Sequence, residues 1–533
     1  MRANVELGLS RQRADGAATP PKRCGVVPHR PGLDRALLPV PCRPHTCRIP
    51  AADHRRDNPA PGSFARTTPL PEIALMTIAP APNPQAPTAT AHGADLDTTL
   101  ATLANGVRVV TIALPHLHTA SVSVFIRSGS EHESKRLSGI SHFVEHMAFK
   151  GTHTRDCQRI NLDAERLGAD VNAHTDKDHT AFHMRGLARD AVPFLTMLGD
   201  IVRNSSFPAA ELEREREVIL QEFIEDDDDG LSVAYKLFDQ TCYGAHPMAQ
   251  PVIGTRRNIE RFTRDDLLGY VNSQYSGVNV VVGVAGNVDA EQILAAADAA
   301  FGSMARGSEN LTTAPDYVGG IESRRLTGCP QTHVVLGFPI PSRTEPHMAS
   351  VVAAALFGEG MSSPLLDEIR ERRGLVYYAA CSADVMTRCG QFTVEASTAP
   401  ENVGEFIVEV TRLLHAHTAA IDPVGLERAR NQIAVRSLLS HERPAQRLEA
   451  AAQDLFVHGR LRSQAELTAT LNAVTAEQVR AAFVQMLAAK ASVALAGKVG
   501  KGLNERVLGL MAAGAGAATG TAAEVAEDKA TFG

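Results

Sequence analysis

Two histidines and a glutamate within five residues are the part of this sequence best suited to chemistry. His142, Glu145 and His146 follow the spacing H-x-x-E-H, and on a helix these three positions share one face. Two imidazoles one turn apart can bind one metal ion, while a carboxylate beside them can act on a water molecule. The spacing therefore predicts a helix that carries a hydrolytic zinc site.

A zinc site that keeps a position for water needs a third protein ligand. A glutamate-rich helix predicted from about Ala209 to Phe223 carries Glu222, which we expect to be that ligand, giving one Zn²⁺ per chain. Glu215, two turns earlier on the same face, is expected to orient a ligand or stand beside it. Glu145 should not bind the metal. We expect it to take a proton from the attacking water and deliver it to the leaving amine.

Alternating and β-branched segments predict the strands that position this helix, and helical periodicity predicts its neighbours. Strands are expected at residues 107–112, 120–126, 170–175, 180–185 and 278–285, and helices at 159–167, 191–203 and 264–274. The strands at 170–175 and 180–185 should pair with each other. This mixture is typical of an α+β fold.

The same order of segments recurs a little over 210 residues later. Three pairs of segments match: 212–216 with 426–430, 262–263 with 474–475, and 286–288 with 497–499. The second copy has Ala429 and Arg436 where the first has Glu215 and Glu222, and it contains no H-x-x-E-H. We therefore predict two homologous halves, of which only the first can hold the metal.

Composition divides the chain into five parts. We predict a disordered Pro/Arg-rich segment at 1–92, the zinc-binding half at 93–306, a linker at 307–324, the homologous half without metal at 325–507, and an Ala/Gly-rich tail at 508–533. Three interpretations of residues 1–75 stay open: translation that starts at Met76, a natural disordered tail, or a targeting peptide.

The net charge of −7 is unevenly distributed. Residues 1–75 hold 12 basic and 6 acidic residues, so the remainder, with 41 basic and 54 acidic residues, is near −13. An acidic body disfavours nucleic acid and mildly favours basic peptides. No apolar run approaches the roughly 20 residues that cross a bilayer, which predicts no membrane insertion. Eight scattered cysteines favour a reducing compartment: the cytoplasm, or an organelle matrix if the chain begins with a targeting peptide.

Three more histidines, His174, His179 and His183, lie near the expected strand pair. We expect their side chains to point to mixed faces of the strands, with structural or substrate-groove roles rather than a second metal cluster.

The run from Gly139 to Thr152, followed by Glu215 and Glu222, resembles the pitrilysin superfamily of inverted zincin metallopeptidases, in its mitochondrial-processing-peptidase-like branch. The similarity extends over nearly all of residues 95–505. The predicted fold is α+β, with two homologous halves, each a mostly antiparallel sheet covered by helices, that form a clamshell.

Three further segments carry this resemblance. Asn172-Ala173-His174-Thr175 resembles the family's N-A-x-T strand, whose backbone receives the substrate as an added strand, so Asn172 and Ala173 are implied to bind substrate. Residues 358–363 resemble its Gly-rich loop. Arg370 and Tyr377 resemble an Arg…Tyr pair that reaches from the second half to the zinc site, and the resemblance implies that they position substrate and stabilise the tetrahedral intermediate.

Two departures from the family pattern concern substrate contacts. Pro364 replaces the arginine that usually ends S-S-R, and Asp178 replaces a usual glutamate. Cleavage preference therefore stays open.

The expected function is a zinc metalloendopeptidase that cuts unfolded peptides or presequence-like segments. The resemblance implies a homodimer or a heterodimer with a related subunit. Two alternatives stay open: a non-catalytic scaffold or assembly subunit of the same fold, and a peptide-binding protein that retains zinc. The intact set of His142, Glu145, His146 and Glu222 argues against a scaffold, which needs none of them.

Overall fold

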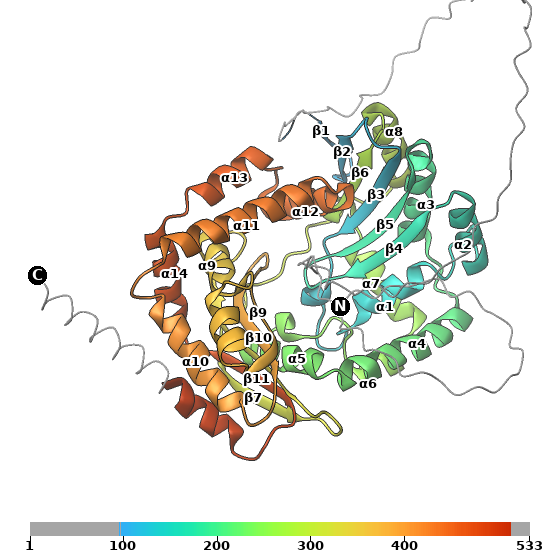
Figure 1. Ribbon diagram of the computed structural model, residues 1–533. Coiled ribbons are helices and arrows are strands. Elements are labelled where there is room, and N and C mark those ends of the chain that lie inside the picture. The colour runs from blue at the N-terminus through green and yellow to red at the C-terminus, as the bar shows by residue number, and fades with distance from the viewer. Residues whose placement is uncertain (1–94, 96, 513–533) are drawn as a thin grey trace, which may run out of the picture. The chain divides into compact units, whose positions relative to one another are not determined.

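Two mixed β-sheets, each covered by helices, make up the part of the chain that the computed structural model describes, residue 95 and residues 97–512 (Figure 1). These residues fall within one compact unit. The predicted disordered segment 1–92 lies outside the described residues, as do Met76 and residues 513–533 of the predicted tail.

The first sheet has six strands, of which β4 forms one edge. Their order is β1 (Thr98–Thr102), β2 (Arg108–Ala113), β6 (Val280–Gly286), β3 (Thr119–Ile126), β5 (Thr180–Leu187) and β4 (Asp170–Thr175). Only β2 and β6 are parallel; the other neighbours are antiparallel. The predicted pairing of residues 170–175 with 180–185 is confirmed as β4 and β5.

The second sheet repeats five of these strands in the same order and directions. It contains β7 (Gly320–Arg325), β11 (Ser492–Gly497), β8 (Thr332–Ile340), β10 (Gly390–Thr398) and β9 (Val376–Val385), and only β7 and β11 are parallel. This shared topology confirms the predicted α+β fold of two similar halves. Strand β7 begins inside the stretch 307–324 that composition assigns to a linker, because its backbone pairs with β11.

The repeated threonines begin equivalent helices in the two halves. Thr263 caps α7 (Arg264–Gln274) and Thr475 caps α14 (Ala476–Leu487), each accepting a hydrogen bond from the third helical amide. In both, the side chain of that third residue returns a bond to the threonine amide, which satisfies two otherwise unpaired backbone groups. The sequence match at 262–263 and 474–475 therefore reflects the same local structure.

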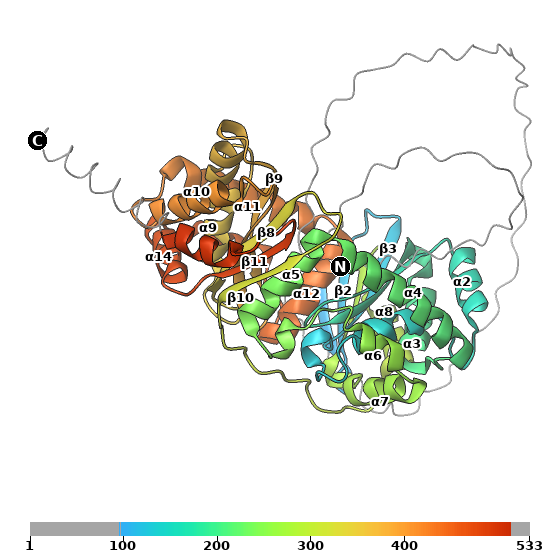
Figure 2. The same cartoon turned by 90° about the horizontal axis from the view of Figure 1, so that it is seen from below.

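Helices from both halves cover the first sheet. On one face, α3 (Ala191–Asn204) and α8 (Ala290–Phe301) bury their apolar sides against the strands. The other face is covered by α12 (Pro444–His458), which comes from the second half (Figure 2). Leu448 and Leu455 of α12 share a core with Phe125 and Val281.

The second sheet is covered in the reciprocal way. One face packs against α9 (Met348–Gly358) and α14. The other face packs against α5 (Gly230–Tyr243) from the first half (Figure 1). Phe238 of α5 lies with Val335 and Ala494 in one core. Each half thus contributes one helix to the core of the other.

The remaining helical segments lie at the ends of the strands and around the two sheets. They are α1 (Ile140–Ala148), α2 (Cys157–Arg166), α4 (Ala209–Asp228), α6 (Arg256–Arg261), α10 (Val403–Ala416), α11 (Pro423–His441), α13 (Gln464–Asn472), the π-helix η5 (Leu365–Arg372), and the short turns η1 (Ser130–His132), η2 (Ala188–Asp190), η3 (Pro247–Ala249) and η4 (Gly277–Asn279). Among the described helices, none combines the length and apolar character needed to cross a membrane.

Two sequence expectations are wrong in detail. Residues 503–512 form a helix, so the predicted tail from 508 begins with ordered structure; Val507 is buried in the core of the second half.

His174, His179 and His183 do not point to mixed faces. The register sets His174 opposite Ala181 and Asn172 opposite His183, and positions separated by two or four residues share a face. All three histidines therefore lie on the side covered by α12.

Candidate metal centre

Helix α1, which carries H-x-x-E-H, is buried along its whole length. Phe143 and Met147 pack in a core with Phe262, so the opposite face presents His142, Glu145 and His146. Gly139 is the N-cap of this helix, and its φ of +97° suits glycine. The buried carboxylate of Glu133 accepts hydrogen bonds from the Gly139 and Ser141 amides at 2.7 and 2.8 Å, which caps the helix.

His142, His146 and Glu222 bring three ligand atoms together. Oε2 of Glu222, on α4, lies 3.8 Å from His142 Nε2 and 3.4 Å from His146 Nε2. Bonds of 2.0–2.2 Å in tetrahedral geometry place ligand atoms about 3.3–3.6 Å apart, so this spacing suits a zinc ion. His146 Nε2 is buried without a hydrogen-bond partner, as is His142 Nδ1. The donor set and the unpaired nitrogen that faces Glu222 both fit zinc.

Glu215 orients one of these ligands. Its Oε2 lies 3.1 Å from His146 Nδ1, and its Oε1 lies 2.6 Å from Lys150 Nζ. A proton on Nδ1 leaves the Nε2 lone pair of His146 for a metal. Burial alone would raise the pKa of Glu215, but the hydrogen bonds from His146 and Lys150 hold it below its usual value. Sequence reasoning missed Lys150, which lies just beyond the C-terminal end of α1.

Glu145 is fully buried and held by one oxygen. Its Oε2 accepts a hydrogen bond from the Thr175 hydroxyl at 2.6 Å, while its Oε1 is buried without a partner. Burial raises the pKa of Glu145, which makes its carboxylate a better proton acceptor near neutral pH. Thr175 was also missed as a site residue, although it ends the N-A-x-T segment.

The electrostatics of the cluster favour a positive charge between the ligands. Burial lowers the pKa of His142 well below its ordinary value. Burial also lowers that of His146, but the hydrogen bond with Glu215 and the nearby Glu222 carboxylate outweigh it and raise the pKa to about 10. A metal cation and a proton compete for the same nitrogen.

Asn172 and Ala173 lie on the edge strand β4. The Ala173 amide donates to Asn172 Oδ1 at 2.8 Å. The outer side of an edge strand can pair with an extended peptide. The structure therefore places both residues where an added strand would lie, on the strand that also carries Thr175.

Arg370 and Tyr377 are not brought to the metal cluster in this structure. Arg370, on η5, lies 3.6 Å from Met361 Sδ and 3.7 Å from a Glu371 oxygen, and Tyr377, on β9, is 85% exposed. No hydrogen bond or ion pair joins either side chain to the three ligand residues or Glu145, all of which are described.

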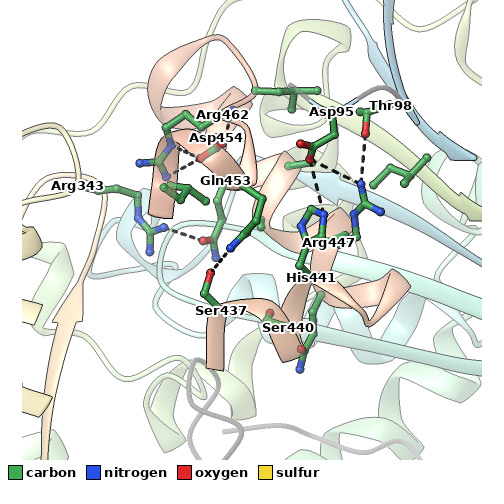
Figure 3. A pocket seen from close by; sticks show the side chains of 17 residues that line it. Asp95, Thr98, Arg343, Ser437, Ser440, His441, Arg447, Gln453, Asp454 and Arg462 are labelled. Atoms are coloured by element: carbon green, nitrogen blue, oxygen red, sulfur yellow. Dashed lines mark hydrogen bonds and ion pairs between the residues drawn. The ribbon is translucent and has the colours of Figure 1, made fainter. Parts of the chain in front are cut away.

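A separate pocket lies where α11 meets α12 and takes no part in this cluster. Figure 3 shows its polar side chains paired with one another: Arg462 with Asp454, Arg343 with Gln453, and His441 with Asp95. No residue of the metal cluster lines it. We assign no chemistry to this pocket, because its charged groups are already paired.

Comparison with known proteins decides the family. Residues 108–256 match the family model described as "Insulinase (Peptidase family M16)", and residues 261–433 match the one described as "Peptidase M16 inactive domain". An uncharacterized zinc protease of Rickettsia bellii is 30% identical over 74% of this chain and 96% of its own length. This chain belongs to peptidase family M16. The predicted resemblance is thereby confirmed at the family level, while the processing-peptidase-like branch stays a prediction.

Other M16 relatives and solved structures agree with this assignment. An uncharacterized zinc protease of Mycobacterium bovis is 32% identical over 75% of this chain and 93% of its own. A peptidase M16 inactive domain from Pseudomonas fluorescens shares the fold with a TM-score of 0.69 at 23% identity, over 76% of this chain and 99% of that one. A chain of Complex III2 from Candida albicans matches with a TM-score of 0.69 at 17% identity, over 77% and 99% of the two chains. The relatives are named zinc proteases, which supports a metallopeptidase at the family level.

Proposed function

We propose that the protein is a zinc metalloendopeptidase that hydrolyses unfolded peptides or presequence-like segments, with Glu145 as its general base. One observation carries the proposal: a buried carboxylate with one unpaired oxygen stands beside two histidines and Glu222, whose ligand atoms are spaced for one metal ion. A structural zinc site would use four protein ligands and need no such base.

His142, His146 and Glu222 would hold the ion. When bound, zinc supplies a Lewis acid that makes water acidic and polarises the peptide carbonyl. Glu145 takes the proton of the attacking water at its unpaired Oε1 and later delivers it to the leaving amine. Thr175 keeps the other oxygen of Glu145 in place. Glu215 fixes the tautomer of His146, and Lys150 fixes Glu215.

The substrate would bind as an extended strand along β4. Asn172 and Ala173 lie on this edge, and the Thr175 hydroxyl bonds Glu145 from the same strand. A peptide paired with the β4 backbone would therefore pass close to the base. Only a chain that offers a free extended segment can pair in this way, which favours unfolded peptides over folded proteins.

Arg370 and Tyr377 are proposed to act on the substrate after it binds. A guanidinium and a phenol can donate hydrogen bonds to an oxyanion that develops during the reaction. The low number of contacts made by Tyr377, which is 85% exposed, leaves its side chain available to a ligand.

The proposal extends to assembly and compartment. We propose a homodimer or a heterodimer with a related subunit, in a reducing compartment such as the cytoplasm. The five cysteines among the described residues are all free, which supports a reducing environment. The scaffold alternative is not favoured, because Glu145, the two histidines and Glu222 are all present.

The test uses the full chain with an unstructured basic peptide, and each cleavage product is identified by mass spectrometry. We expect cleavage that stops with a chelator and returns with zinc. Glu145→Gln should lower kcat on the order of 10²–10⁴-fold while zinc content is unchanged. Glu165→Gln, at an exposed position of α2, is the matched control and should keep full activity. Peptide binding without cleavage by the zinc-loaded chain would overturn the proposal.

A further inference from the structure

We propose that a second divalent transition metal ion, with Zn²⁺ as the best fit, binds between the β4–β5 hairpin and α12 through His174, His179 and Glu449. This site is separate from the single zinc per chain that the sequence predicts. Nitrogen and carboxylate oxygen donors together are typical of zinc.

Three ligand atoms converge at this position. His174 Nε2 lies 3.3 Å from His179 Nε2, and Oε1 of Glu449 lies 3.6 Å from the first nitrogen and 2.7 Å from the second. Tetrahedral bonds of 2.0–2.2 Å require separations of about 3.3–3.6 Å. Two of the three distances already meet this requirement, and the third would open by roughly 0.6 Å as the ion replaces a hydrogen bond.

The outer nitrogen of each ligand ring is already fixed by a neighbour. His179 Nδ1 lies 2.8 Å from Asp178 Oδ1, and His174 Nδ1 lies 3.0 Å from His183 Nε2. His183 Nδ1 in turn lies 2.8 Å from the Ser123 hydroxyl. With a proton on Nδ1 of each of the three histidines, every one of these hydrogen bonds has a donor. The Nε2 lone pairs of His174 and His179 then both face Glu449. Metal-binding histidines are usually held in this way.

Charge and exposure also suit a bound ion. Two carboxylates, Glu449 and Asp178, would balance a dication. The His179 side chain is 3% exposed, while those of His174 and Glu449 are 16% and 27% exposed. Solvent can therefore reach the fourth position of a site with three protein ligands, and the ion has a path of entry.

Protons are the competing occupant of this site. Burial lowers the pKa of His179, but Glu449 and Asp178 outweigh it and raise the pKa well above its ordinary value. A histidinium between these carboxylates would also tie α12 to the hairpin. A bound metal ion and a bound proton give different metal contents per chain, so measuring the metal distinguishes them.

The position of the site suggests what the ion does. His174 precedes Thr175 on β4, and Thr175 bonds Glu145 from the opposite face of the strand. Glu449 belongs to α12, which comes from the second half. A metal here would fasten that helix to the strand that positions the general base. We assign it a structural role, without direct contact with the substrate.

The first test counts metal in the full chain after equilibration with zinc and removal of free ion. The catalytic-site variant is His142→Asn with Glu222→Gln, and the hairpin variant is His174→Asn with His179→Asn. We expect two zinc ions per wild-type chain, one in each variant and none when both are combined. A hairpin variant with the same zinc content as the wild type would overturn the proposal.

A second measurement protects the test against misfolding of the hairpin variant. Co²⁺ is titrated into the metal-free catalytic-site variant and followed by visible absorption. We expect saturable tetrahedral bands with one ion per chain, and Glu449→Gln on this background should weaken binding at least 10-fold while the chain stays folded in chelator. Absence of any Co²⁺ band would assign the cluster to protons alone. Glu442→Gln, at the end of α11, is the control and should bind Co²⁺ normally.

Discussion

At the scale of single residues, the proposed catalysis depends on how one buried carboxylate is held. Glu145 is bonded through Oε2 and presents Oε1 without a partner. Leaving a buried acceptor unpaired costs about 1–3 kcal/mol, so a structure that keeps one beside a metal cluster indicates a task for it. The motif alone is enough to propose Glu145 as the base. Its partner Thr175 could not be predicted from spacing, because the two lie 30 positions apart and meet only through the tertiary fold.

The hydroxyl of Thr175 should matter for rate and not for zinc binding. Thr175→Val removes the 2.6 Å bond to Glu145 while it keeps the side-chain shape. We expect kcat to fall about 10-fold, equivalent to roughly 1.4 kcal/mol, with unchanged zinc content. Thr393→Val, which removes a buried hydroxyl bonded to Ser382 in the second sheet, is the control. Equal activity of the two variants would show that the bond does not position the base.

At the scale of elements, the strands and helices for which the sequence predicted bounds lie within about two residues of the observed ones, apart from the end of α4. Helix α7 was predicted at its observed bounds, because its threonine cap and its periodicity agree. The faces of the histidines were predicted wrongly, since the register of an antiparallel pair is set by the turn between the strands and by packing. Helix α4 runs past the predicted Phe223 to Asp228, because buried Asp226 pairs with Lys236 on α5.

Gly139, the residue that caps the N-terminus of α1, is a sensitive point of this architecture. A Cβ at Gly139 would lie 2.7 Å from the carbonyl oxygen of Ile253, at a φ of +97°. We expect Gly139→Ala to lower the free energy of unfolding by about 1–3 kcal/mol and to weaken zinc binding. Gly168→Ala is the control, since its φ is +62° with open space around it. If both variants unfold at the same urea concentration, the close approach to Ile253 is not the cause.

At the scale of the whole molecule, the two halves are joined by an exchange of helices. Periodicity shows that α5 and α12 each have an apolar side, but it cannot show which sheet that side will meet. The predicted boundary at 307–324 therefore separates the two repeats along the chain. It does not separate the hydrophobic cores, because each core includes a helix from the other repeat. Arg447 strengthens the exchange through two hydrogen bonds to Asp97, at the start of β1.

A core substitution in α12 should destabilise the sheet of the other half. Leu448 is 1% exposed and packs against Gly283 of β6. We expect Leu448→Ala to cost about 2–5 kcal/mol and to reduce hydrogen-exchange protection in β3 and β6. Leu439→Ala, at a half-exposed position of α11, should cost less than about 0.5 kcal/mol. If Leu448→Ala lowered hydrogen-exchange protection only in the second sheet, α12 would not be part of the first core.

The ion pair between Arg447 and Asp97 should give a pH-dependent contribution to stability. The hydrogen bond from Arg447 lowers the pKa of Asp97. The contribution is therefore present above the ordinary pKa of about 3.9 and is lost as the pH falls through the lowered folded-state pKa. Because the Asp97 side chain is still 34% exposed, solvent screens the pair, and we expect Asp97→Asn to cost about 1 kcal/mol at neutral pH and nothing at low pH, in urea titrations. Asp170→Asn, at an exposed pair with Arg185, should show no such difference.

The exchange of helices also sets a timetable for synthesis on the ribosome. The first sheet is complete once β6 has emerged at Gly286, yet the helix that covers its second face ends at His458. About 170 residues separate these points, and translation at about 5–20 residues per second takes roughly 10–30 s to cover them. During that interval the apolar surface around Phe125 and Val281 is not covered by α12. Nascent chains stopped before residue 458 should therefore recruit chaperones or aggregate, whereas chains released after α12 should not.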